Sequence, residues 1–185
     1  MGEYSLHNAV GHFKTITHHK ILVMKKCFRV GLYAQGLLHD MSKYSWEEFR
    51  VGMKYYQGTR SPNNAEREDI GVSTSWLHHK GRNKHHFEHW VDYDKDGGPL
   101  ILAGCRMPRR YVAEMAMDRI SASQIYNPDN YNDQLPLQYF ERSRKRLWFV
   151  DKRTKKELHL ILRILAEQGE EAMYDFVKHV YLRKK

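Results

Sequence analysis

Histidine and aspartate are the residues of this sequence whose number and spacing could do chemistry. The chain has 185 residues and 12 histidines, five of them within the single segment WLHHKGRNKHHFEHW. Neutral imidazole is a common ligand of transition metals, and imidazole combined with carboxylate suits Mn, Fe, Co, Ni or Zn. A chance cluster of solvated histidines is the alternative. The density favours a site for one or two divalent transition metal ions.

A second feature of this kind is the segment GLLHDMSK, where an apolar stretch ends in His39 and Asp40. Neighbouring residues of a helix point about 100° apart, so both side chains reach one ion only if it lies in the angle between them. For the dipeptide alone, a polar cap at the end of a helix is the better interpretation.

The surrounding residues change that interpretation, because LLHDMSK resembles the signature of the HD-domain superfamily of metal-dependent phosphohydrolases. In that family an apolar helix runs into His-Asp, and a lysine follows three residues after the aspartate, as Lys43 does here. The family pattern also has a histidine about one helix upstream and an aspartate on a later helix. His19, followed by Val23, matches the upstream position, with His18 as an alternative one residue away. Asp118, in AEMAMDRISAS, matches the downstream one.

The resemblance implies a primary metal site made of four residues: His19, His39, Asp40 and Asp118. Asp40 would be able to bridge two ions. Asp118 stands in an apolar helical stretch, where a buried carboxylate is costly without a partner, and a metal gives it a reason to be there.

Dinuclear branches of the superfamily add histidines between the His-Asp pair and the final aspartate. His79 and His86 are the favoured additions, because residues seven apart share one face of an unbroken helix. Gly81 could break that helix, so His85 stays an alternative to His86. The remaining histidines of the cluster are expected behind the ligands or at the surface.

The function implied by the resemblance, which covers roughly residues 12–125, is hydrolysis of a phosphate ester such as a nucleotide or a related phosphorylated metabolite. One or two ions would activate water and neutralise phosphoryl charge. Asp40 and Lys43 would be the catalytic residues, with Lys43 contacting the phosphate. Three cations near His79 are further candidates for substrate binding, or else face solvent: Lys80, Arg82 and Lys84. Four aromatic residues could stack a nucleobase or belong to the core: Tyr55, Tyr56, Trp76 and Trp90.

The histidine-rich segment in the middle of the chain bears on which branch of the superfamily the sequence resembles. HHKGRNKHH does not match the motif of the HD-GYP cyclic-dinucleotide phosphodiesterases, and it resembles an uncharacterised bacterial and phage branch. A diiron oxygenase of the same superfamily type is an alternative reaction class. A non-enzymatic nucleic-acid-binding module is another, since the net charge is +9 and basic residues gather between Arg142 and Lys156. Such runs are also typical of a solvated helix face.

The expected fold is all-α. Apolar residues recur at spacings of three and four, and no alternating strand series is present. We expect one helical bundle of the HD-domain type over 1–185, with a metal-site core at about 12–125 and a basic helical C-terminal extension at about 136–185. Helices are predicted over 6–38 (one or two), 45–56, 65–79, 83–91, 108–125, 136–149, 155–168 and 170–182, with loops over 58–64, 92–99 and 127–133.

Several classes of protein are disfavoured. The two cysteines, Cys27 and Cys105, form no CxxC pair, so we expect neither a disulfide scaffold nor a cysteine zinc site. We expect a cytoplasmic location, and each cysteine should be a small buried residue. No stretch reaches the ~20 apolar residues that span a bilayer, and the polar N-terminus does not resemble a signal peptide. The aspartates of DYDKDGGP suggest a calcium loop, but Ala103 stands where its twelfth-position glutamate belongs.

Overall fold

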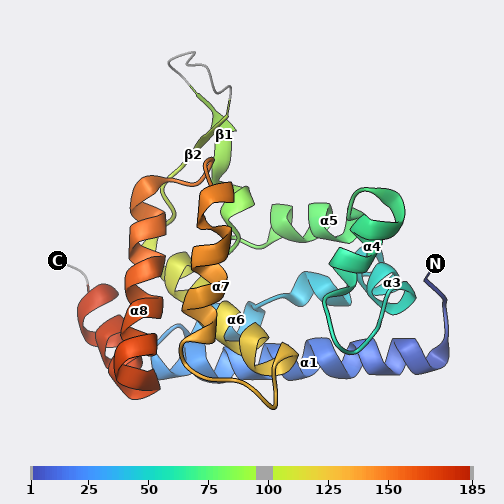
Figure 1. Ribbon diagram of the computed structural model, residues 1–185, viewed down its shortest axis with the longest axis horizontal. Helices are drawn as coiled ribbons and strands as arrows, with labels where there is room; N and C mark the ends of the chain where they lie inside the picture. Colours follow the sequence, from blue (N-terminus) through green and yellow to red (C-terminus); the bar gives the residue numbers. More distant parts are fainter. Residues whose placement is uncertain (1, 95–101, 184–185) are drawn as a thin grey trace.

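The architecture of the chain is helical, as predicted (Figure 1). The structure, a computed structural model, describes residues 2–94 and 102–183. Its helices are α1 (Leu6–Arg29), α2 (Tyr33–Leu38), α3 (Trp46–Lys54), α4 (Pro62–Ile70), α5 (Thr74–Arg82), α6 (Arg109–Tyr126), α7 (Leu135–Ser143) and α8 (Lys152–Asp175). Short helical turns cover Met41–Tyr44, Phe87–Trp90, Arg144–Arg146 and Phe176–Tyr181. Strands β1 (Val91–Tyr93) and β2 (Leu102–Gly104) pair antiparallel, with Val91 opposite Gly104.

Helix α1 is the base on which two groups of helices are built. It packs against α2, α3 and α6. In Figure 1, α3–α5 stand over its N-terminal half and α6–α8 over its C-terminal half. Its buried residues follow helical spacing and place two histidines on the same face as apolar core residues: His12, Ile16, His19, Val23, Lys26 and Cys27. Ser5 begins the helix, because its side chain accepts a hydrogen bond from the backbone N–H of Asn8.

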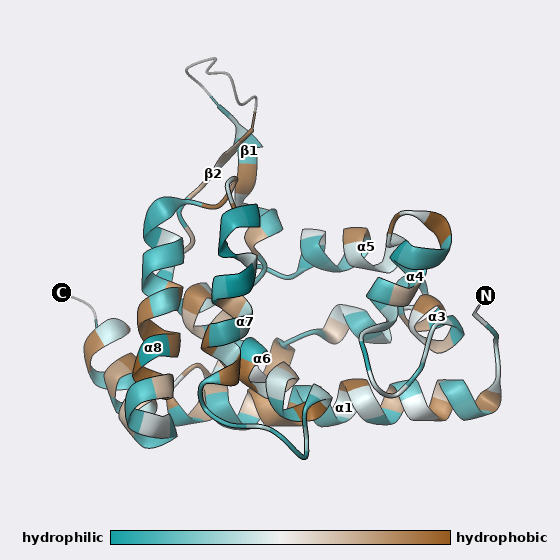
Figure 2. Cartoon of the chain, in the orientation of Figure 1, coloured by the Kyte–Doolittle hydropathy of each residue, from teal (hydrophilic) through white to brown (hydrophobic). Residues whose placement is uncertain are grey.

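The main hydrophobic core lies between α1, α6, α7 and α8. Figure 2 shows hydrophobic and hydrophilic segments alternating along α1 and α8, as helices with one buried face require. Phe140 of α7 and Leu158, Ile161, Leu162 and Leu165 of α8 are fully buried in this core. The segment expected as a C-terminal extension therefore packs directly on α6 and forms part of the core that holds the metal-site helices.

The predicted helix over 65–79 is wrong, because two helices occupy this stretch. Gly71 adopts φ 80, a left-handed conformation that glycine enters without steric cost, and it ends α4. Ser73 then starts α5, its side chain accepting from the backbone N–H of Trp76. Helix α4 begins at Pro62, inside the predicted loop over 58–64, since proline is favoured in a first helical turn. A small second apolar cluster, Val51, Tyr55 and Ala65, joins α3 to α4.

Other boundaries also differ from the predictions. Residues 83–91 form a turn, a short 3-10 helix and the start of β1 instead of an α-helix. The predicted loop over 92–99 begins inside β1, and its residues 95–99, which include Asp96 and Gly97 of the calcium-loop pattern, lie outside the described residues. Helix α7 ends at Ser143, short of residue 149. The break predicted between the helices over 155–168 and 170–182 is confirmed, because Gly169 within α8 has a non-helical backbone, with φ 84.

Two further sequence expectations can be compared with the structure. Cys27 is buried as expected, but Cys105 is exposed. Within residues 2–94 and 102–183, no helix has both the length and the apolar character needed to cross a membrane.

Candidate metal centre

The His39-Asp40 pair follows a helix rather than lying within one. Helix α2 ends at Leu38, and Asp40 adopts a left-handed conformation, φ 53 and ψ 26, which is uncommon for a residue other than glycine. Lys20 supports the departing chain, because its Nζ donates to the backbone oxygens of Leu37 at 2.6 Å and His39 at 3.0 Å. The resulting turn buries both His39 and Asp40, so the 100° argument for neighbours on a helix does not apply.

The first ligand set is the one expected from the sequence: His19, His39, Asp40 and Asp118. Nε2 of His19 lies 2.9 Å from Asp118 Oδ1 and 3.8 Å from Asp40 Oδ2. Nε2 of His39 lies 3.4 Å from Asp40 Oδ2 and 3.7 Å from Asp118 Oδ1. One donor atom from each residue falls within 4.8 Å of the others, a spacing that one ion could satisfy. His18, the alternative to His19, is exposed.

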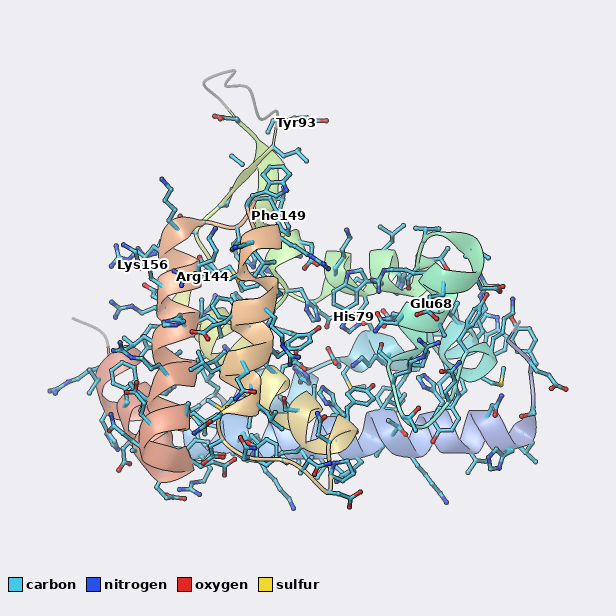
Figure 3. The ribbon with its side chains drawn as sticks, in the orientation of Figure 1. Glu68, His79, Tyr93, Arg144, Phe149 and Lys156 are labelled. Atoms are coloured by element: carbon cyan, nitrogen blue, oxygen red, sulfur yellow. The ribbon has the colours of Figure 1, made fainter. Side chains whose placement is uncertain are left out.

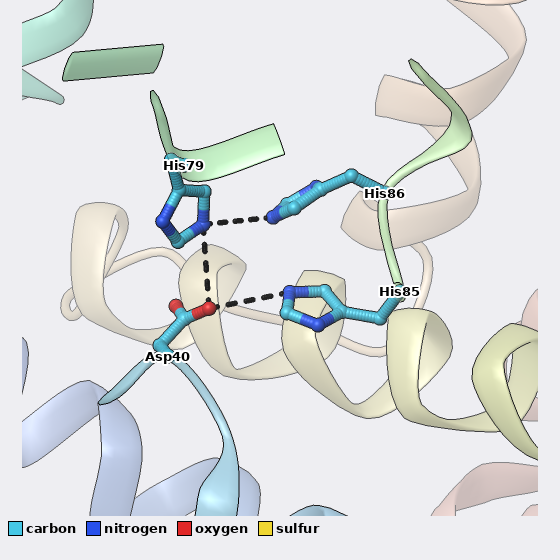
Figure 4. Close-up of side chains that lie close together, drawn as sticks. All are labelled: Asp40, His79, His85 and His86. Atoms are coloured by element: carbon cyan, nitrogen blue, oxygen red, sulfur yellow. Dashed lines mark hydrogen bonds and ion pairs between the residues drawn. The ribbon is translucent and has the colours of Figure 1, made fainter. Parts of the chain in front are cut away.

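A second ligand set meets the other oxygen of Asp40 (Figure 4). Nε2 of His79 and Nε2 of His85 each lie 3.3 Å from Asp40 Oδ1. Nε2 of His86 lies 2.9 Å from Nε2 of His79. His79 and His86 therefore meet as the sequence suggested. His85, expected behind the ligands or as an alternative to His86, joins them and is buried.

A turn, not a shared helix face, brings these three histidines together. Helix α5 ends at Arg82, and Asn83 closes it by donating from its backbone N–H to the oxygen of His79. The side-chain amide of Asn83 also donates to Ser42 Oγ at 2.8 Å, which ties the turn to the His-Asp segment. Because the chain after Asn83 is not helical, the neighbouring His85 and His86 rings converge, with centroids 4.1 Å apart.

Two buried glutamates hold the outer nitrogens of the candidate ligands. Oε1 of Glu114 accepts from Nδ1 of His39 at 3.0 Å and lies 3.2 Å from Nδ1 of His85. Oε2 of Glu48 accepts from Nδ1 of His79 at 2.8 Å. A carboxylate on Nδ1 fixes the tautomer in which Nε2 is free to bind a metal.

Sequence reasoning missed both glutamates. Glu114 stands four residues before Asp118 on α6, and this spacing puts both on one helix face. That spacing was a usable signal. Glu48 lies in the first turn of α3, and no local pattern in the sequence distinguishes this buried residue from its neighbour Glu47.

The buried polar atoms at the centre indicate that the site fits a metal. Four side-chain atoms there are buried without a well-directed hydrogen bond: His19 Nε2, His39 Nε2, Asp40 Oδ1 and His85 Nε2. Leaving such atoms unpaired is costly, and native structures rarely do so without an ion or a water. Imidazole and carboxylate donors around one point are the combination that divalent transition metals prefer.

The charges of the site favour ionised carboxylates. Burial opposes ionisation of Asp40, but the neighbouring His39 and Lys43 charges hold its pKa well below the usual value. Burial likewise opposes ionisation of Asp118, but the adjacent His19 and His39 imidazoles hold its pKa well below the usual value. Lys43 Nζ lies 2.6 Å from Asp40 Oδ2. The centre therefore presents two carboxylates ready to bind cations.

A cleft of about 610 Å³ opens onto both ligand sets, and its walls come from the α3–α5 group and from α6 and α7. Four cationic side chains line it: Lys43, Arg60, Arg67 and Arg119. Lys80, Arg82 and Lys84, the other substrate-binding candidates, are not lining residues. Arg82 and Lys84 are exposed, and Lys80 is half-buried. The lining of this cleft therefore gives no support to their assignment to substrate binding.

Of the four aromatic residues considered for stacking a nucleobase, two line the cleft and two do not. Trp76 and Tyr56 line the cleft. The Trp76 ring stacks on His79, with centroids 5.5 Å apart. Trp90 packs against Tyr111, and Tyr55 is buried in the small second cluster, so neither of these two is a lining residue.

Comparison with known proteins adds a family but no activity. Residues 8–164 match DUF5662, a family of unknown function, and the chain belongs to this family. The match includes every candidate ligand from His19 to Asp118. No curated protein and no solved structure matches the chain.

Proposed function

Since the DUF5662 family has no assigned function, we propose one from the geometry: the chain is a dinuclear, metal-dependent phosphohydrolase of the HD-domain type. The observation that carries the proposal is the position of Asp40. Its Oδ2 faces His19 and His39, whereas its Oδ1 faces His79 and His85. A carboxylate whose two oxygens meet two separate ligand sets is suited to bridge two ions.

The proposed division of ligands follows these contacts. One ion would be held by His19, His39, Asp118 and Asp40 Oδ2, and the other by Asp40 Oδ1 with His79, His85 and His86. Two bound ions would supply Lewis acidity and lower the pKa of water, which is the chemistry that phosphate-ester hydrolysis needs. Glu114 and Glu48 orient the imidazoles from outside.

The chain's own residues would bind and position the substrate. Lys43 lines the cleft and carries a positive charge that its neighbours Asp40 and Asp118 favour, so it would bind a phosphoryl oxygen as a point charge. The cleft volume of about 610 Å³ lies within the range of small-molecule sites, and Trp76 offers an aromatic wall beside the metal centre. These features support a nucleotide or a similar phosphorylated metabolite as substrate.

The experiment pairs elemental analysis of the purified protein with a phosphatase panel in Mn, Co, Ni and Fe. We expect bound transition metal and phosphate release that Asp118→Asn lowers by at least about hundredfold, since it removes a ligand. The exposed His7 gives a matched control, His7→Gln, which should keep full activity. Thermal melts of both variants establish that they fold.

Two other outcomes would replace the proposal. Oxygen consumption with a mixed-valent iron signal and no phosphate release would favour a diiron oxygenase. Salt-sensitive nucleic-acid binding that survives Asp40→Asn, without any turnover, would favour a binding module. The basic residues for that module are separable from the metal centre, because Arg144 and Lys156 lie over α7 and α8, apart from His79 (Figure 3).

A further inference from the structure

The cleft contains a half-buried arginine, Arg119, that the metal centre does not use. Arg119 follows the candidate ligand Asp118 on α6 and lines the cleft. Its Nε is buried without a hydrogen-bond partner. Its Cζ lies 5.3 Å from the centre of the Phe87 ring and 5.9 Å from that of Phe140. The two rings hold the guanidinium in place and supply no acceptor.

No acidic residue in the described parts of the chain forms an ion pair with Arg119. Asp118 forms its ion pair with His19, 2.9 Å away, and its charge, like those of Tyr139 and Glu88, acts on Arg119 without a direct contact. A buried cation that lacks a paired anion is costly, and a bound anion would remove that cost.

The other cations of the cleft differ in how they are paired. Lys43 is paired with Asp40, and Arg60 makes two hydrogen bonds to Glu68, at 2.7 and 2.8 Å. Arg67 resembles Arg119: in the described residues it hydrogen-bonds only to uncharged oxygens, those of Asn63 and Asn64.

Both unpaired arginines adjoin the same side of the metal centre. The guanidinium of Arg67 lies over the Trp76 ring, 5.8 Å from its centre, and Trp76 contacts the His86 ring. Arg119 lies over Phe87, the residue that follows His86. Two cations without acidic partners therefore line the same cleft as His86.

We propose that the substrate carries a second oxyanionic group, a phosphate or a carboxylate, bound by Arg119 with help from Arg67 while its phosphate ester lies at the metal centre. This inference rests on the proposed function. A planar guanidinium donates two parallel hydrogen bonds to such a group, and its aromatic neighbours hold the fork in a fixed plane. A substrate with one phosphate would leave Arg119 unpaired. The preferred substrates are bisphosphorylated compounds or phosphorylated carboxylic acids.

The test measures binding of non-hydrolysable probes to the metal-loaded protein by calorimetry. The probes are phenylphosphonate, which has one oxyanion, a set of linear diphosphonates with spacers of increasing length, and phosphonocarboxylates of the same lengths. We expect the best two-headed probe to bind about tenfold or more tightly than phenylphosphonate, as a charge-assisted pair implies. The ranking of diphosphonates against phosphonocarboxylates identifies the second group.

The variants assign that gain to particular arginines. Arg119→Met should remove the tenfold gain while leaving phenylphosphonate binding within about twofold, and Arg67→Met should remove part of it. Arg60→Met is the matched control, because Arg60 lines the same cleft but is already paired, and it should change neither affinity. We expect Arg119→Met to melt no lower than the wild type, since it removes an unpaired buried charge and keeps a similar apolar length.

Contrary results are well defined. Equal affinity for one- and two-headed probes, including no binding of either, overturns the inference, as does an equal loss of both in Arg119→Met. Arg119-dependent binding without hydrolysis of any phosphate ester would refute the proposed function and leave the anion site standing. Hydrolysis with the same kcat/KM for esters with one and two oxyanions, in both the wild type and Arg119→Met, would refute the anion site and leave the proposed function standing.

Discussion

Glu114 Oε1 lies 3.0 Å from Nδ1 of His39, at the back of the first ligand set. The same oxygen lies 3.2 Å from Nδ1 of His85, which belongs to the second set. One carboxylate on α6 thus fixes the tautomer and the ring orientation of an imidazole in each set, and it couples the two proposed ions from outside.

Glu114→Gln should weaken binding of both ions by about tenfold to hundredfold, because an amide holds the two imidazole N–H groups less strongly than a carboxylate does. Metal titration by calorimetry or equilibrium dialysis measures the change. Glu141→Gln is the control, since Glu141 contacts His159 at the surface, far in the sequence from every candidate ligand. If Glu114→Gln binds metal as tightly as the wild type, the glutamate does not support the ligands.

Helix α3 packs so closely on α1 that Gly52 leaves no room for a side chain. A Cβ at Gly52 would lie 2.0 Å from Nε2 of the buried His12. Gly52→Ala should destabilise the fold by about 1–3 kcal/mol, because the His12 ring must move against the Phe49 ring, whose centroid is 5.3 Å from its own. Denaturant unfolding of the variant measures this loss.

Gly81→Ala provides the comparison for that substitution. Gly81 is also helical, but a Cβ there meets nothing within 4 Å. Its replacement should be neutral or stabilising by up to about 1 kcal/mol, because alanine is the better helix former. Equal effects of the two substitutions would show that the contact with His12 does not limit the packing of α3.

The stability of the metal-free protein should depend on pH through His12. Burial, with a smaller effect of Lys43, lowers the pKa of this histidine from 6.5 to about 4. As the pH falls below 6.5, His12 therefore becomes protonated in the unfolded chain but stays neutral in the folded chain. The contribution of His12 is complete above that pH and is lost toward pH 4, with a limit of about 3 kcal/mol.

His12→Gln removes this titration, so the variant should lose less stability than the wild type between pH 7 and pH 4. Unfolding in urea with a chelator present, at a series of pH values, measures the difference. His7→Gln, at an exposed position of the same helix, should follow the wild type. Parallel curves for His12→Gln and the wild type would contradict the assignment.

The long helices were predictable from sequence because their apolar spacing is repeated over several turns. Helix α6 (Arg109–Tyr126) agrees with the predicted 108–125 to within a residue at each end. The break at Gly71 was missed because the flanking residues keep a helix-like pattern, although the left-handed Gly71 and the extended Ser73 separate α4 from α5. Its position before the Ser73 cap could have indicated the break.

The candidate site was predictable to the extent that local motifs encode it. The resemblance of the residues around His39 and Asp40 to the HD-domain signature was sufficient to select His19 and Asp118, which the structure brings together with them. The role of His85 was not predictable, because it depends on a turn that Asn83 and Ser42 hold together across the fold. Arg119 was missed as well, since only tertiary packing shows which cations face the cleft.

The number of metal ions bound per chain is the most direct test of the central claim. After equilibrium dialysis against a transition metal, elemental analysis should find two ions in the wild type, one in Asp118→Asn and one in His79→Gln. Asp40→Asn should retain less than one, because both ligand sets lose their shared carboxylate. A wild-type chain that binds at most one ion, or an Asp40→Asn variant that keeps both, would contradict a dinuclear centre bridged by Asp40.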